Sequence, residues 1–230
     1  FELKGSAKAE RSGEGTTYMG LSENSFVNKS ANFSKVTFQV TDGYITIKPK
    51  SIVPDPEDHD NTMSVNAPAS VVYNGQVQQQ EPVVKDGDKT LVEGTDYTLS
   101  YSEDATNVGT VKVTVTGMGN YTGKAKVSYL ITPAPLSITT DSDTKVYDGT
   151  PLTARGSIEG LVADETVEFK VTGSQTLVGS SKNTYELKWN GSAKESNYEI
   201  KKSDIGTLSV TAQSINPEDP ISYKGVTVGD

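Results

Sequence analysis

Val111-Lys112-Val113-Thr114-Val115 is the stretch that decides the fold, because apolar valines alternate in it with polar residues. A period of two places successive side chains on opposite faces of an extended strand, so one face can be buried while the other meets water. The same alternation occurs at 97–101, 127–131, 167–171 and 185–189, whereas helical periodicity is almost absent. The sequence therefore predicts an all-β chain of short strands separated by turns rich in Gly, Asn, Asp and Pro.

Three landmarks outside these strands occur twice in the same order, which indicates an internal repeat. They are a Tyr-x-Gly (Tyr73-Asn74-Gly75 and Tyr147-Asp148-Gly149), a Val-Gly (Val108-Gly109 and Val178-Gly179) and an Asn-aromatic pair (Asn120-Tyr121 and Asn197-Tyr198). The outer landmarks are almost equally far apart in the two copies, so we expect the same fold twice.

Landmarks at the two ends of the chain extend this repeat and predict four parts. These are 1–52, a partial β module of a second type that lacks its N-terminal part; 53–132, a complete Ig-like β module of a first type; 133–213, a complete second-type module with the Tyr-Asp-Gly motif; and 214–230, the start of a further module. We expect small Ig-like β-sandwich modules in tandem, arranged end to end. The alternative is a set of β-grasp-like modules, each of which would require a helix.

Composition excludes several classes of function. The 21 basic and 30 acidic residues give a net charge of −9, which opposes nucleic acids and anionic lipids, so we predict no nucleic-acid partner. No run of 18 apolar residues is present, so no membrane insertion is expected. The absence of cysteine removes disulfides and thiol nucleophiles. Because the chain begins at Phe1 without a targeting segment, we interpret it as a fragment.

Two groups of motifs resemble known repeats. Glu93-Gly94-Thr95-Asp96-Tyr97 and Gly119-Asn120-Tyr121-Thr122-Gly123 resemble Ig-like repeats in surface proteins of Gram-positive bacteria, and Lys145 to Leu152 resembles the companion repeats named for their Tyr-Asp-Gly motif. The resemblance implies an extracellular adhesin stalk on the bacterial cell surface, attached to the cell wall. It also implies host or matrix proteins, glycans and neighbouring modules of the same chain as partners.

Residues that could carry chemistry are sparse, so we predict that the chain is not an enzyme and has no catalytic site and no cofactor. The single histidine, His59, lies in an acidic, proline-flanked stretch and is interpreted as solvated. Carboxylates crowd the same stretch, and oxygen ligands at such junctions can bind Ca²⁺. We interpret the stretch as a solvated linker and predict no metal site.

Aromatic residues leave one functional alternative open. Trp189 follows Tyr185 and Leu187 at a period of two, which predicts that it lies in the core. The landmark residues Tyr73, Tyr147 and Tyr223 are interpreted as packing anchors. The function expected is therefore a non-catalytic stalk or spacer that also serves in adhesion. The alternative is a carbohydrate-binding accessory region of a large secreted glycan-degrading enzyme, which would present coplanar exposed aromatic rings.

Overall fold

The computed structural model describes residues 1–102 and 104–214 of the chain. This part is all-β, as predicted, and its helical elements are two short 3-10 turns, η1 (Glu23–Ser25) and η2 (Glu195–Asn197). A β-grasp module needs a helix packed on its sheet, and the described residues contain no α-helix. None of their helical turns is long and apolar enough to cross a membrane.

The chain folds into two compact units, and each unit contains segments that are distant in sequence. Unit 1 consists of Phe1–Val71, Val77–Ala105 and Gly109–Ile131, and unit 2 of Val72–Gln76, Thr106–Val108 and Thr132–Asp230, described as far as residue 214. The two short segments of unit 2 carry Tyr73 and Val108, which belong to landmarks of the first copy. Unit 2 therefore includes more than the second copy of the repeat.

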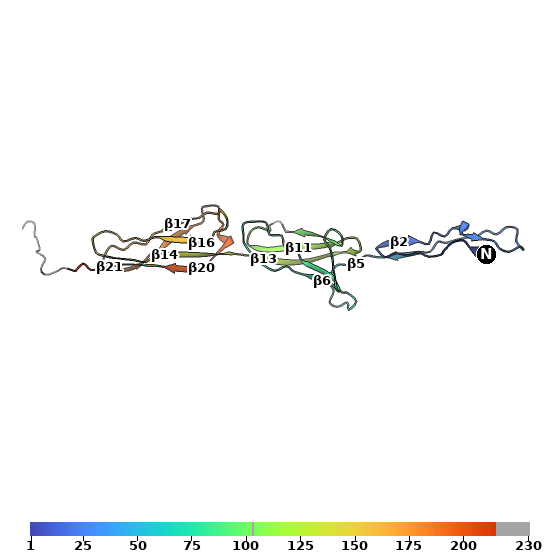
Figure 1. Ribbon diagram of the computed structural model, residues 1–230, viewed down its shortest axis with the longest axis horizontal. Coiled ribbons are helices and arrows are strands. Elements are labelled where there is room, and N and C mark those ends of the chain that lie inside the picture. The colour runs from blue at the N-terminus through green and yellow to red at the C-terminus, as the bar shows by residue number, and fades with distance from the viewer. Residues whose placement is uncertain (103, 215–230) are drawn as a thin grey trace, which may run out of the picture. The chain divides into compact units, whose positions relative to one another are not determined.

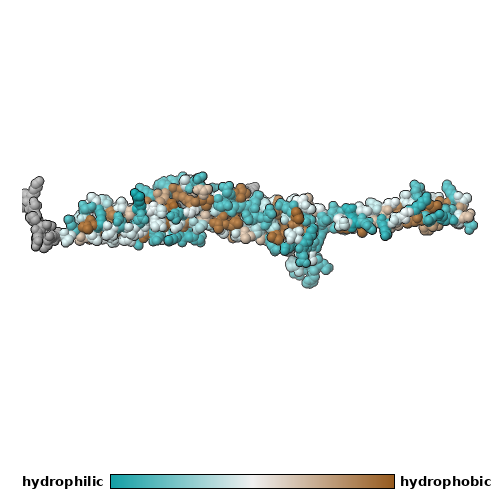
Figure 2. Space-filling model, in the orientation of Figure 1, coloured by the Kyte–Doolittle hydropathy of each residue, from teal (hydrophilic) through white to brown (hydrophobic). Residues whose placement is uncertain are grey.

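The N-terminal part of unit 1 has a thin core. Its strands are β1 (Glu2–Leu3), β2 (Gly15–Tyr18), β3 (Phe26–Val27), β4 (Tyr44–Ile47) and β5 (Lys50–Ser51). β1 pairs with β3 and β2 with β4, both antiparallel. No residue of 1–51 is fully buried, and the rings of Phe1, Phe26 and Phe38 cluster instead with centroids 5.6 to 6.1 Å apart. Figure 2 shows apolar residues, in brown, near these strands.

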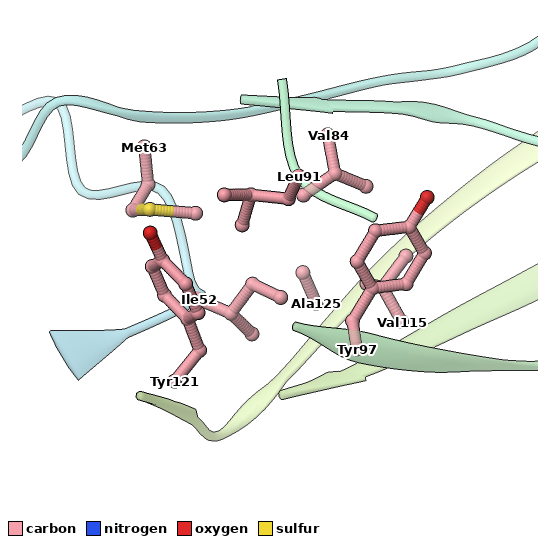
Figure 3. Packing of buried hydrophobic residues seen from close by; sticks show 8 residues of the cluster. All are labelled: Ile52, Met63, Val84, Leu91, Tyr97, Val115, Tyr121 and Ala125. Carbon is pink, nitrogen blue, oxygen red and sulfur yellow. The ribbon is translucent and has the colours of Figure 1, made fainter. Parts of the chain in front are cut away.

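The rest of unit 1 is built on a four-stranded sheet. Its strands are β6 (Met63–Asn66), β7 (Val71–Val72), β8 (Val83–Asp86), β9 (Lys89–Thr90), β10 (Tyr97–Tyr101), β11 (Gly109–Gly117), β12 (Tyr121–Thr122) and β13 (Lys124–Thr132). The sheet has the order β10-β11-β13-β7, and a second sheet has the order β6-β8-β9. Eight residues from both sheets and the connecting segments form the core shown in Figure 3: Ile52, Met63, Val84, Leu91, Tyr97, Val115, Tyr121 and Ala125.

Unit 2 contains two three-stranded sheets and a strand pair. Its strands are β14 (Ala134–Thr140), β15 (Asp143–Val146), β16 (Gly156–Glu159), β17 (Glu168–Val171), β18 (Gly179–Lys182), β19 (Tyr185–Lys188), β20 (Tyr198–Ile205) and β21 (Thr207–Thr211). β14 lies between β16 and β20 (Figure 1). β21 lies between β15 and β18, and β17 pairs with β19. β14 runs parallel to β20 and β15 parallel to β21, whereas the other pairs are antiparallel.

The strand pairings of the two copies correspond. Among the antiparallel pairs, β6–β8 matches β14–β16, β10–β11 matches β17–β19, and β11–β13 matches β18–β21. The parallel pair β5–β12 matches β14–β20. The long strand β11 is replaced in the second copy by two shorter ones, β18 and β19. β1–β3 and β2–β4 repeat the pattern of β17–β19 and β18–β21. The repeat predicted from the landmarks is thus visible as repeated strand pairing.

Candidate functional site

The Tyr-x-Gly landmark of the first copy forms a tight turn. Asn74 Oδ1 accepts a hydrogen bond from the Gln76 amide at 2.9 Å, which is the local bond that favours Asn in turns. Gly75 has a φ of +77°, in the left-handed region that favours glycine. The Tyr73 amide donates to the Thr132 carbonyl at 2.8 Å. These bonds fix Tyr73 at the start of the turn, where only 5% of its surface is exposed.

The second copy forms the same turn but leaves its tyrosine more exposed. Asp148 Oδ1 accepts from the Thr150 amide at 2.9 Å, and Gly149 has a φ of +80°. Lys145 Nζ lies 2.7 Å from Asp148 Oδ1, and this hydrogen bond is the main reason why the pKa of the Asp148 carboxyl is well below its usual range. Tyr147 is 38% exposed. The expectation of a buried anchor therefore holds for Tyr73 and is wrong for Tyr147.

A carboxylate shared by two tyrosines is the centre of the candidate site in unit 2. The hydroxyls of Tyr73 and Tyr198 both donate hydrogen bonds to the Glu165 side chain. The two rings meet edge to face, with centroids 5.7 Å apart and planes 80° apart. The Val162 amide also donates to the Tyr198 hydroxyl at 3.0 Å. The packing anchor Tyr73 is thus also tied to a carboxylate through its hydroxyl.

Burial and the shared carboxylate raise the pKa of both hydroxyls above the ordinary value. Burial raises the pKa of Tyr198 to about 12, and its hydrogen bond to Glu165 acts in the same direction. The pKa of Tyr73 is raised for the same two reasons, burial first. Each hydroxyl proton therefore stays in a hydrogen bond to Glu165 at neutral pH. The arrangement is suited to holding segments of unit 2 together.

Trp189 extends this cluster by stacking on Tyr198. Their ring centroids are 5.6 Å apart and their planes differ by 22°. The indole is only half-buried, as are Tyr185 and Leu187 at the alternate positions before it. The prediction that these three share one face is consistent with this pattern. The prediction that Trp189 lies in the core is wrong, because this face is only partly covered.

Asn197 joins a second short segment to unit 2. Its side chain is fully buried, and its amide group donates to Asn107 Oδ1 at 2.9 Å. Asn197 Oδ1 accepts from the Val108 amide at 3.0 Å. Lys194 Nζ lies 3.3 Å from Asn107 Oδ1 as well. In the Asn-aromatic landmark, Asn197 thus binds the segment Thr106–Val108, and the adjacent Tyr198 binds Glu165.

The acidic stretch interpreted as a solvated linker forms local hydrogen bonds. The side chains of Asp55 and Asp58 each accept a hydrogen bond from the amide two residues later, at 3.0 Å. His59 is exposed. Within 1–102 and 104–214, no three His, Cys, Asp or Glu residues are placed to hold a metal ion. The related Glu218 and Asp219, the landmark Tyr223 and almost all of the predicted further module at 214–230 lie outside the described residues.

Glu165 is the site residue that the sequence did not reveal. It follows the β16 strand in a loop that carries no recognisable motif. One local signal is visible only in the backbone, since Ala163, two residues earlier, has a φ of +48°. A left-handed conformation is uncommon for residues other than glycine and often marks a constrained site. In this chain, the residue in that left-handed conformation is Ala163, in the turn directly before Glu165.

Comparison with known proteins gives one family match, within the second copy. A family model described as a YDG domain matches residues 132–205, about a third of the chain. No curated protein and no solved structure matches the chain. The resemblance to Gram-positive surface repeats is therefore corrected, because the family found is the YDG domain and not an Ig-like repeat of that group. Residues 132–205, which contain the Tyr147-Asp148-Gly149 turn, are similar to a YDG domain.

Proposed function

We propose that this chain is a non-catalytic array of β modules that acts as a stalk or spacer in a secreted or bacterial cell-surface protein. The observation that supports this best is the repeated strand pairing, which occurs in both copies and in part among β1 to β4. Repeated small modules with contacts to their neighbours add length without a single large core. The partners proposed are neighbouring modules of the same chain.

The strand directions in unit 2 support a role under tension. β14, the first strand of its main segment, runs parallel to β20 and pairs with it from Ala134 opposite Tyr198 to Thr140 opposite Ile205, with a register shift between Leu136 and Ser137. β15 and β21 continue this parallel arrangement. Because β14 and β15 run parallel to β20 and β21, a force on the two ends pulls the first two strands and the last two strands along each other in opposite directions. All hydrogen bonds between them then share the force, which resists rupture better than breaking them one by one.

Stretching single molecules by their two ends tests this function. We expect separate unfolding events, and a module of about 80 residues should release roughly 28 nm of chain. Extension without resistance to force would contradict the proposal. Unfolding of the whole chain in one event would contradict the proposal that the chain is an array of separate modules.

A carbohydrate-binding role is the second candidate, and one observation favours it. Tyr18 and Tyr44 are directly opposite each other on β2 and β4, both are exposed, and their ring centroids are 5.5 Å apart. The ring planes are tilted by 53° to each other, so the pair offers two separate ring faces and not one flat platform. A glycan array with the chain and its Tyr18→Ala variant decides this candidate. Binding that the variant loses would support it, and an array without signal would exclude it for the glycans printed.

A further inference from the structure

The same hydrogen bond between landmarks occurs once in each unit. In unit 2, the Val108 amide donates to Asn197 Oδ1 at 3.0 Å. In unit 1, the Glu14 amide donates to Asn120 Oδ1 at 2.7 Å. Both acceptors are the asparagine of an Asn-aromatic landmark, and both donors directly precede a glycine with positive φ. The bond is therefore a property of the repeat and not of one pair of side chains.

Val178 occupies the third position of this kind. It precedes Gly179, whose φ of +142° lies in the range shared by the other two glycines. Gly179 begins β18 opposite Val210, as Gly15 begins β2 opposite Ile47. Within 1–102 and 104–214, the Val178 amide has no hydrogen-bond acceptor. The third donor thus has the same backbone geometry as the other two, but in the described part of the chain no asparagine accepts its hydrogen bond.

The side chains around this donor are also uncovered. Leu177 is 69% exposed and Val178 is 57% exposed, whereas Val108 at the equivalent position is half-buried. Tyr147 is far more exposed than its counterpart Tyr73, which the Glu165 cluster covers. Val146 and Gly179, the neighbours of Tyr147 and Val178, pair with Thr211 and Val210 on the two sides of β21. Exposed apolar side chains at one end of a sheet, beside an amide without an acceptor in the described residues, are typical of an interaction surface.

We infer that Tyr147, Leu177 and Val178 form a docking surface for a further module of the first type, whose asparagine accepts a hydrogen bond from the Val178 amide. The first type is chosen because the N-terminal part of unit 1 matches β17 to β21 in its pairing, and its donor Glu14 binds Asn120. This inference rests on the proposed array. To the proposed array it adds the partner that binds the exposed end of the second copy.

A lengthened chain provides the occupant. In it, a second copy of residues 51–132 is joined directly after residue 213. This joining point is chosen because Gly15 pairs with Ile47 and Gly179 pairs with Val210, so Ser214 is the equivalent of Ser51. Amide hydrogen exchange of Val178 is followed by NMR in the lengthened and the original chain. We expect exchange at Val178 to slow by about tenfold or more in the lengthened chain. Asn120→Ala in the added copy alone should restore the original rate.

Two results would overturn the docking surface. The first is unchanged exchange at Val178 when the added copy is folded. The second is slowed exchange at Val178 that persists when Asn120 of the added copy is replaced by Ala. Either result combined with normal unfolding forces would leave the spacer function intact, so the two proposals fail separately.

Discussion

The hydroxyl of Tyr73 donates a hydrogen bond to the carboxylate of Glu165, which lies 92 residues later in the chain. The bond connects the Tyr-x-Gly turn of the first copy to a loop of the second, and both lie in unit 2. Tyr198 shares the same carboxylate. Residues 132–214 alone therefore lack part of the structure that stabilises this unit.

Removal of the shared carboxylate should destabilise unit 2. Glu165→Ala leaves the Tyr73 and Tyr198 hydroxyls without their acceptor, and we expect a loss of about 1 to 3 kcal/mol in unfolding free energy. Urea denaturation followed by Trp189 fluorescence measures it. The matched control is Glu159→Ala, an exposed carboxylate in the same unit, which should have little effect. Equal effects of the two variants would show that Glu165 is not a stabilising centre.

Stability should fall at high pH because of Tyr198. Its pKa in the folded chain is about 12, above the value of about 10 for the unfolded chain. A raised pKa stabilises the fold fully below pH 10, and this contribution is lost as the pH rises from 10 to 12. Unfolding free energies at pH 9 and pH 11.5 test the effect. Tyr198→Phe should lose less stability than the original chain over this interval, and an identical loss would contradict the assignment.

The two landmark tyrosines form a matched pair of test positions. Tyr73→Ala removes a buried ring and the hydrogen bond to Glu165, and it should cost about 3 kcal/mol. Tyr147→Ala removes the more exposed ring from the same kind of turn and should cost much less. Thermal unfolding of both variants gives the comparison. The burial seen in the structure would be wrong if Tyr147→Ala were the more damaging change.

Trp189 should contribute less than a core aromatic residue. Complete burial would predict a cost of about 3 to 5 kcal/mol for its replacement by Ala. Since the indole is half-buried and stacked on Tyr198, we expect about 2 kcal/mol for Trp189→Ala. Denaturation followed by circular dichroism measures this value. A loss within error of zero would place the indole in solvent and favour the carbohydrate-binding candidate.

Local features of the fold could be predicted from the sequence because they depend on neighbouring residues. The Tyr-x-Gly turns follow from an Asn or Asp that bonds the amide two residues later and from a glycine with positive φ. The alternation at 97–101 and 111–115 likewise corresponds to β10 and β11. Such signals require no knowledge of distant contacts.

The candidate site could not be predicted, because it depends on contacts between distant segments. Glu165 has no motif around it, and its importance arises only when Tyr73 and Tyr198 reach it from other parts of the chain. Tyr73 and Tyr147 occupy the same landmark, yet one is buried and the other partly exposed. What covers each ring is determined by tertiary packing, which the landmark does not encode.

The direction of pulling provides the most direct test of the spacer function. The chain contains no cysteine, so pairs of cysteines can serve as unique attachment points. Pro135 and Glu199 are exposed register partners at the same end of β14 and β20, whereas Thr211 lies at the far end of β21. Handles at 135 and 211 pull the parallel strands along each other, and handles at 135 and 199 peel them apart. We predict a clearly higher unfolding force for the first pair, and equal forces for the two pairs would contradict a unit built to resist tension.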